Sequence, residues 1–252
     1  MEAPSIFVAV PAYGGSIRTQ CVHAIIDLLQ HLWNRKIRAA YETIDNAEIA
    51  AARNFLASRF YYSGFSHLLF VDGDMVFSAA DVERLVAADK PLIGAVYPHR
   101  HNFPLLHAIA LGRELEPARA LAMATRFVVY YQGETGQKAE FDVLDGICRV
   151  GGLGMGLALI SRAVLEQLCA TGKIRTQQRH QFKNFGLDQL LFGFFDPIYR
   201  ADEYASEDMA FCERWRELCG GEVWALVSRK IGHIGEMVFD TPYIEKLKGG
   251  QL

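Results

Sequence analysis

The strongest chemical signal in the sequence is a pair of aspartates directly after an apolar run. Residues 68–71 read Leu-Leu-Phe-Val, and Asp72, Gly73 and Asp74 follow them. Such a run is typical of a strand buried in a parallel sheet, and ligands bind at the carboxyl ends of these strands. Two carboxylates there can hold a divalent cation that keeps open positions for phosphate oxygens. The alternative is a strand-end turn with two solvated aspartates.

A second carboxylate cluster lies at the predicted start of a helix. Ser206 is a good N-cap, and acids in the first turn, here Glu207 and Asp208, interact favourably with the helix dipole. Asp208 shares a helical face with Phe211 and Trp215, which we expect to pack inward, whereas Glu207 is turned away by about 100°. A carboxylate directed toward the core needs a partner or a function. Asp208 is therefore a candidate base, with helix capping as the alternative.

The third candidate is a histidine close to the C-terminal end of the sequence. His233 lies in the segment Ile-Gly-His-Ile-Gly at 231–235, after an apolar strand predicted at 223–227. A neutral imidazole is a suitable ligand for Mn²⁺ or a related ion. The alternative is a turn histidine that is hydrogen-bonded to the backbone.

The elements that position these residues alternate between strands and helices in the first half of the chain. This alternation predicts an α/β fold with a parallel sheet and right-handed crossovers. The second half is mixed, and a polar, Gly-rich turn is predicted at 132–138. The predicted strands are 6–10, 37–43, 68–71, 92–97, 127–131, 141–143, 147–150 and 157–160, and the predicted helices are 19–33, 48–62, 78–87 and 162–169.

Length and composition are those of an ordinary globular protein. The chain has 252 residues, of which 51% are hydrophobic and 22% are charged, and a single domain of this size is common in α/β proteins. The net charge of −3 argues against a general nucleic-acid binder. The 5 cysteines form no CxxC pair, as expected for reduced thiols in the cytoplasm. We see no signal peptide and no membrane-spanning run, and we expect a cytoplasmic protein.

Taken together, the motifs resemble those of GT-A-fold glycosyltransferases, which use nucleotide-sugar donors. The segment 72–74 looks like their DxD motif, and the segment 206–208 is similar to the Glu-Asp motif of inverting, family-2-like members. His233 matches the late histidine that completes their metal site. Ala-Arg-Asn at 52–54 precedes the DxD strand, as in bacterial and viral glycosyltransferase-like proteins, and the Gly-rich segment 151–156 resembles the one beneath the sugar. The resemblance spans about residues 5–235, in the family's order.

The resemblance implies a fold and a reaction. The fold is GT-A, a Rossmann-like single domain with a mostly parallel sheet flanked by helices, a nucleotide-binding half over 1–98 and an acceptor half over 99–252. The reaction moves a sugar from a UDP- or GDP-linked donor to a glycan, lipid-linked or other hydroxyl acceptor, without nucleic acid. Mn²⁺ or Mg²⁺ is expected on Asp72, Asp74 and His233, although Asp72 facing the ribose is an alternative. Asp208 is expected as the general base of an inverting transfer.

The resemblance also implies contacts with the donor. Tyr13 is expected to stack on the base, and Arg53 is expected to bind phosphate, with Asn54 next to Arg53. Asp72 is also expected to contact the donor, and Gly154 and Gly156 are expected to allow close approach of the backbone to the sugar. Each has a structural alternative: Tyr13 as a loop aromatic, Arg53 as an exposed helix arginine, and the two glycines as a simple turn.

Two further segments remain open. Residues 173–204 align with no motif and are expected to carry the acceptor preference, with a mobile lid around Gly186 and Gly193. The aromatic residues at 185–199 suit sugar rings or a lipid-linked acceptor at a membrane surface, and a hydrophobic core segment is the plain alternative. The histidines and arginine at 99–101, with His107, suit phosphate, metal or a solvated loop.

Two other functional classes also place carboxylates after an apolar strand. A haloacid-dehalogenase-type phosphatase uses the first aspartate, here Asp72, as a nucleophile. That class usually has a threonine where this chain has Val76. A non-catalytic module that binds a sugar nucleotide or a glycan is the other alternative, and it would need no base.

Overall fold

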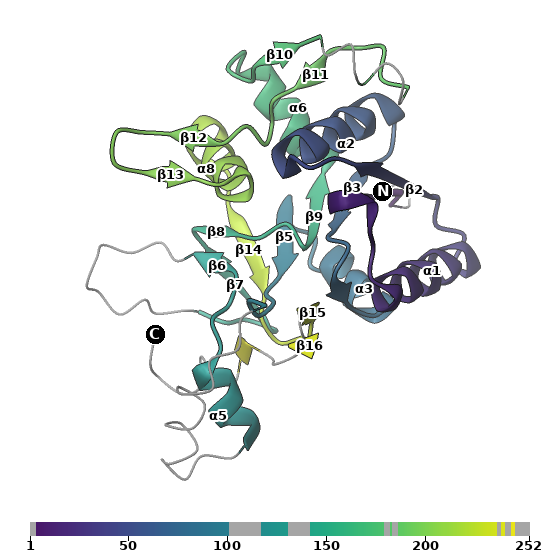
Figure 1. The fold of residues 1–252 in the computed structure, drawn as a ribbon, viewed down its shortest axis with the longest axis vertical. Helices are drawn as coiled ribbons and strands as arrows, with labels where there is room; N and C mark the ends of the chain where they lie inside the picture. The colour runs from purple at the N-terminus through teal and green to yellow at the C-terminus, as the bar shows by residue number, and fades with distance from the viewer. Residues whose placement is uncertain are drawn as a thin grey trace.

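The protein is built around one seven-stranded sheet. The computed structural model describes residues 4–100, 117–130, 142–178, 182, 186–235, 238–239 and 243–244. The strand order is β2-β1-β3-β9-β5-β14-β7 (Figure 1). These strands are β1 (Ile6–Ala12), β2 (Ala39–Asp45), β3 (His67–Val71), β5 (Leu92–Ala95), β7 (Ile147–Val150), β9 (Leu157–Ser161) and β14 (Val223–Leu226).

The sheet is mostly parallel. Strand β1 is parallel to both β2 and β3, and β14 is parallel to β5. Strand β9 lies between β3 and β5 and is antiparallel to both, so β3 and β5 run in the same direction. Strand β7 is antiparallel to β14 at the edge. The predicted α/β class with a mostly parallel central sheet is confirmed, although the inserted antiparallel strand β9 was not expected.

Helices cover both faces of the sheet. Alternate residues of β3 contribute to two hydrophobic clusters, with Leu68 and Phe70 in one and Leu69 and Val71 in the other. The first cluster packs under α2, α6 and α8, and the second packs under α1 and α3 (Figure 1). The helices are α1 (Thr19–Asn34), α2 (Ile49–Ser63), α3 (Ala79–Ala87), α5 (Pro117–Ala124), α6 (Arg162–Ala170) and α8 (Glu207–Cys219), and a short 3₁₀ helix is η1 (Tyr13–Gly15).

Small sheets surround the central one. Strand β15 (Gly232–Ile234) pairs with β4 (Met75–Val76) and with β16 (Val238–Phe239). The other pairs are β6 (Val129–Tyr130) with β8 (Gly152–Leu153), β10 (Thr176–Gln177) with β11 (Leu191–Phe192), and β12 (Ile198–Tyr199) with β13 (Tyr204–Ala205). In the part of the chain described, no helix is long and apolar enough to cross a membrane.

Some local predictions differ from the structure. The strand predicted at 127–131 contains only Val129–Tyr130 as regular strand, and residue 131 lies outside the described residues. Of the strand predicted at 141–143, residues 142–143 are not in a strand, and residue 141 lies outside the described residues. The turn predicted at 132–138 also lies outside them. His101, His107 and Phe185 also lie outside them.

Candidate active site

The ends of two neighbouring parallel strands place the first candidates side by side. Strand β1 leads into Tyr13, and strand β3 leads into Asp72 and Asp74. The turn between the aspartates is tight, since the Gly73 carbonyl accepts a hydrogen bond from the Arg18 backbone N–H at 2.7 Å. A Cβ on Gly73 would lie 3.3 Å from the Ser16 carbonyl oxygen. A glycine there lets the chain before α1 pack against the aspartate turn.

Strand pairing brings His233 to Asp74. His233 lies opposite Met75 in the register of β15 with β4, and the Ile234 N–H donates to the Asp74 carbonyl at 2.8 Å. His233 Nε2 is consequently 3.4 Å from Asp74 Oδ1, while its Nδ1 is 2.8 Å from the Pro98 carbonyl oxygen. Because a carbonyl oxygen only accepts, Nδ1 carries the proton of the neutral ring, and the Nε2 lone pair faces Asp74.

Asp74 is a stabilised carboxylate. Its other oxygen, Oδ2, accepts a hydrogen bond from Arg100 Nη1 at 2.8 Å. Burial opposes the charge of Asp74. The hydrogen bond and charge that His233 contributes when both of its ring nitrogens carry protons, together with the charge of Arg100, lower the pKa of Asp74 below the ordinary value. The group is therefore ionised at neutral pH and attracts cations.

A buried arginine lies on the other side of Asp72. Arg53, from α2, is 2% exposed, and its Nη2 donates to both oxygens of Asp72, at 2.9 and 3.2 Å. Its Nε donates to Glu207 Oε1 at 3.3 Å. Burial opposes the charge of Arg53, but the two carboxylates raise its pKa. Nη1 has no hydrogen-bond partner among the described residues, so one buried donor remains to be satisfied.

The first turn of α8 presents both of its acids to the same space. Asp208 Oδ1 accepts hydrogen bonds from the Ser206 hydroxyl and, at 2.8 Å, from the Met209 N–H. Ser206 thus holds the carboxylate, and its side chain caps no backbone group. No hydrogen bond from another described residue reaches Oδ2 of Asp208, which leaves that oxygen available as a base.

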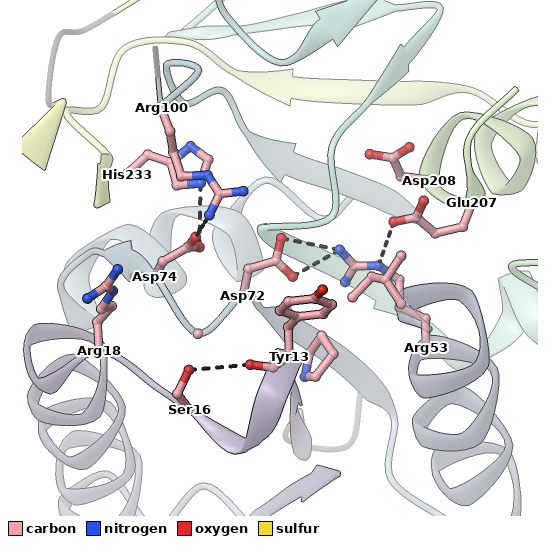
Figure 2. Close-up of a pocket in the computed structure, with 13 residues that line it drawn as sticks. Tyr13, Ser16, Arg18, Arg53, Asp72, Asp74, Arg100, Glu207, Asp208 and His233 are labelled. Carbon is pink, nitrogen blue, oxygen red and sulfur yellow. Dashed lines mark hydrogen bonds and ion pairs between the residues drawn. The ribbon is translucent and has the colours of Figure 1, made fainter. Parts of the chain in front are cut away.

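The prediction for Glu207 was wrong, because the sequence analysis placed its side chain on a helical face turned away from the site. The N-terminal end of α8 points into the site, so neighbouring faces of its first turn both reach it (Figure 2). Burial, together with the charge of Asp208, raises the pKa of Glu207 although Arg53 opposes this. Glu207 is a partner of Arg53 and so contributes to the architecture of the site.

These groups surround one cavity of about 460 Å³ (Figure 2). Its walls combine positive and negative charge, a composition suited to a phosphorylated ligand with a bound cation. Tyr13, which is 71% exposed, lies at the entrance. The charged lining residues are Arg18, Arg53, Arg100, Asp72, Asp74, Glu207 and Asp208, joined by His233.

Three predicted donor contacts do not line the cavity. Asn54 is buried, its Oδ1 accepts from the Phe195 N–H at 2.6 Å, and its Nδ2 donates to Asp196 Oδ1 at 2.9 Å. Asn54 thereby fixes the segment around residue 195 on α2. Added Cβ atoms on Gly154 and Gly156 would lie 2.3 and 2.7 Å from atoms of the Tyr97 side chain. Both glycines therefore make room for this tyrosine.

Tyr97 does not line the cavity but packs behind it against His233, and sequence reasoning missed this role. Its hydroxyl accepts a hydrogen bond from the Gly156 N–H at 3.0 Å, and its ring packs edge-to-face on His233 with centroids 5.2 Å apart. Burial and the charges of Asp72 and Asp208 raise its pKa well above the ordinary value, so it remains neutral. In the sequence it is one more residue of an apolar strand. Arg18, which follows η1, carries no sequence signal either.

The unaligned segment divides into two parts. Phe194 and Phe195 are fully buried, and Phe192 N–H donates to the Ser58 hydroxyl at 2.9 Å, so the core interpretation is right for this stretch. The hairpin formed by β12 and β13 is exposed, and Tyr199 and Tyr204 lie on it.

The predicted three-ligand metal set is not assembled as such. No three His, Cys, Asp or Glu side chains gather at metal-binding distance among the residues whose positions are described. Asp74 and His233 meet, whereas Asp72 is paired with Arg53. Arg100, which the sequence analysis left open between phosphate, metal and solvent, is bound to Asp74.

Comparison with known proteins gives remote structural likenesses only. No protein-family model matches the chain, and no curated protein matches it in sequence. Protein A197 from STIV superposes with a TM-score of 0.48 and 17% identity, covering 94% of each chain. A glycosyltransferase involved in glycosylation of the major capsid of PBCV-1 superposes with a TM-score of 0.32 and 8% identity, covering 67% of this chain and 65% of that one. The function is therefore inferred from the site.

Proposed function

We propose that the protein transfers a sugar from a nucleoside-diphosphate donor to an acceptor hydroxyl with the help of a divalent cation. The observation that carries this proposal is the pair formed by Asp74 Oδ1 and His233 Nε2, 3.4 Å apart in a cavity whose opposite wall holds Asp208. One wall suits a charged leaving group, and the other suits a base.

The donor atoms of Asp74 and His233 fit a divalent metal ion. With Nδ1 protonated against the Pro98 carbonyl, an Nε2 lone pair and a carboxylate oxygen face each other. Two acceptors in this arrangement repel unless a cation lies between them or the ring takes up a second proton. Carboxylate and imidazole are ligands that Mn²⁺ accepts. Bound there, the ion would supply Lewis-acid stabilisation of the departing diphosphate.

Arginines suit the remaining charge of the diphosphate. Arg18 and Arg100 both line the cavity, and guanidinium groups bind phosphate oxygens in pairs of hydrogen bonds. Arg100 would exchange its bond with Asp74 for one with the ligand. Asp72 is held by Arg53, so we assign it to a hydroxyl of the donor ribose, with Tyr13 stacked on the base at the entrance.

Asp208 is proposed as the base that deprotonates the acceptor hydroxyl. Hydrogen bonds from Ser206 and Met209 hold its Oδ1. They orient the carboxylate and leave Oδ2 free to accept a proton. A single base and direct displacement at the anomeric carbon give inversion of configuration. The acceptor would approach past the N-terminal end of α8.

A calorimetric titration tests the metal-dependent donor site. UDP or GDP should bind much more tightly with Mn²⁺ than with a chelator, and Asp74→Asn should remove the difference because it removes a ligand charge. Asp145→Asn is a matched control, since Asp145 is 82% exposed and does not line the cavity. Equal nucleotide affinity with and without metal in the wild-type protein would contradict the proposal.

The phosphatase alternative is less well supported. It needs Asp72 as a free nucleophile, and Arg53 donates to both of its oxygens. Hydrogen bonds to a carboxylate stabilise its charge and lower its reactivity. A binding module without catalysis would show tight donor binding with no product, which mass analysis after incubation with donor detects.

A further inference from the structure

The hairpin that leads into α8 carries two exposed aromatic rings. Tyr199 and Tyr204 are directly opposite each other in the register of β12 with β13, and their ring centroids are 5.1 Å apart. They are 77% and 61% exposed. Two exposed rings in contact form a local apolar patch, and such patches mark binding surfaces.

The hairpin is held in place although it projects from the body of the protein beside α8 (Figure 1). Two-stranded hairpins are marginally stable alone. Here Arg200 forms an ion pair with Glu213 of α8, and its backbone N–H donates to the Glu203 carbonyl at 2.9 Å. Because neighbouring residues of a strand point to opposite faces, Arg200 anchors the hairpin while the tyrosine face stays accessible.

The tyrosines lie next to the proposed base. Only Ala205 and Ser206 separate Tyr204 from the acidic first turn of α8. The pKa of the Tyr204 phenol is raised, first by partial desolvation and then by Tyr199. The carboxylates of Glu207 and Asp208 raise it further, in agreement with this proximity. Neither tyrosine lines the cavity itself, so the pair forms a platform outside it on the side of Asp208.

We propose that Tyr199 and Tyr204 form the acceptor subsite and that the acceptor is a carbohydrate whose ring stacks on them. This inference rests on the proposed transfer reaction. A sugar ring has a face of C–H groups that packs on an aromatic ring, and its hydroxyls need polar partners. The turn between the two strands supplies these, since Asp202 and Glu203 are exposed there.

Charge favours a sugar over a lipid surface as the occupant. Arg200 is already paired, and Asp202 and Glu203 add negative charge at the tip of the hairpin. An anionic membrane would be repelled by these acids, whereas membrane-binding surfaces carry clusters of Lys and Arg. A neutral carbohydrate carries no such penalty.

Saturation-transfer NMR on the full chain tests the platform. The probes are methyl glycosides of glucose, galactose and mannose together with maltotriose and cellotriose, each with UDP and Mn²⁺ present. We expect at least one probe to bind, and Tyr199→Ala or Tyr204→Ala to weaken it about tenfold or more, as for a tyrosine that anchors an interface. Tyr199→Phe and Tyr204→Phe keep the rings and should retain most binding. Tyr41→Ala, an exposed tyrosine on β2, should have no effect.

Two outcomes overturn the inference. One is that no probe binds, or that binding is the same in the alanine variants. The other is tyrosine-dependent binding to phosphatidylglycerol vesicles in place of the sugars. Nucleotide affinity is measured on the same variants and should be unchanged. If UDP and GDP do not bind but sugar binding is lost in the alanine variants, the proposed transfer reaction is wrong, and the hairpin is a carbohydrate-binding site without it.

Discussion

At the scale of single residues, the two acids of the α8 first turn have different partners and so different roles. Glu207 is paired with buried Arg53, whereas Asp208 is oriented by Ser206 and Met209 and keeps one oxygen without a bond from the described residues. A sequence pattern that places both acids in one turn does not separate them. The pairing with Arg53 does.

Substitution of each acid by its amide should separate these roles. Asp208→Asn keeps the shape and removes the basicity, so sugar transfer should fall by about 10²–10⁴-fold with donor binding retained. Glu207→Gln should lower stability by about 1–3 kcal/mol, because the Arg53 charge loses a compensating partner in a buried setting. Initial rates and chemical denaturation measure the two effects. Near-normal turnover in Asp208→Asn would leave Asp208 as a helix-stabilising acid only.

Arg100 competes with a metal ion for Asp74. Its guanidinium is half-exposed and bonded to Oδ2, so Arg100→Ala should tighten Mn²⁺ binding without nucleotide by about two- to fivefold, the worth of an exposed ion pair. The same variant should bind UDP more weakly in the presence of Mn²⁺, because a guanidinium group that binds the diphosphate is lost. Unchanged Mn²⁺ affinity in calorimetry would show that the ion pair and the ion do not share Asp74.

At the scale of elements, the Gly-rich segment before β9 is shaped by Tyr97. Gly156→Ala should lower the free energy of unfolding by about 1–3 kcal/mol, the usual cost of overpacking, since the added Cβ would lie within 2.9 Å of the Tyr97 ring. Urea denaturation measures this. Unchanged stability together with weaker donor binding would instead support the backbone approach to a sugar that the sequence suggested.

Local patterns predicted β1, β3 and α1 well, because these elements are buried in the way their apolar patterns require. The carboxylates of Asp72, Asp74 and Asp208 line one cavity because strand ends and helix starts fix the positions of side chains locally. The partners of Arg53, the position of β9 and the role of Tyr97 depend on residues far apart in the chain. Glu207 lies 154 residues from Arg53, and no periodicity encodes that contact.

At the scale of the whole molecule, Arg53 connects the two halves of the chain, because Asp72 lies in the first half and Glu207 in the second. Arg53→Met would leave the carboxylates of Asp72 and Glu207 without their shared cation in a buried site, so the protein should lose about 3–5 kcal/mol of stability. Thermal and urea unfolding measure the loss, with Arg149→Met as the control because the Arg149–Glu222 pair is exposed. Equal losses of stability in the two variants would mean that the buried cluster contributes no more to the free energy of unfolding than an exposed ion pair.

The position of β9 in the sheet determines when the central sheet can form during synthesis of the chain. Strand β9 separates β3 from β5, yet it follows both in the chain and pairs with each. While the ribosome has released only the first hundred residues, β3 and β5 therefore lack the strand that joins them. A nascent chain at that stage exposes open strand edges, which are templates for aggregation. The sheet closes, and the cavity forms, only after the second half has emerged.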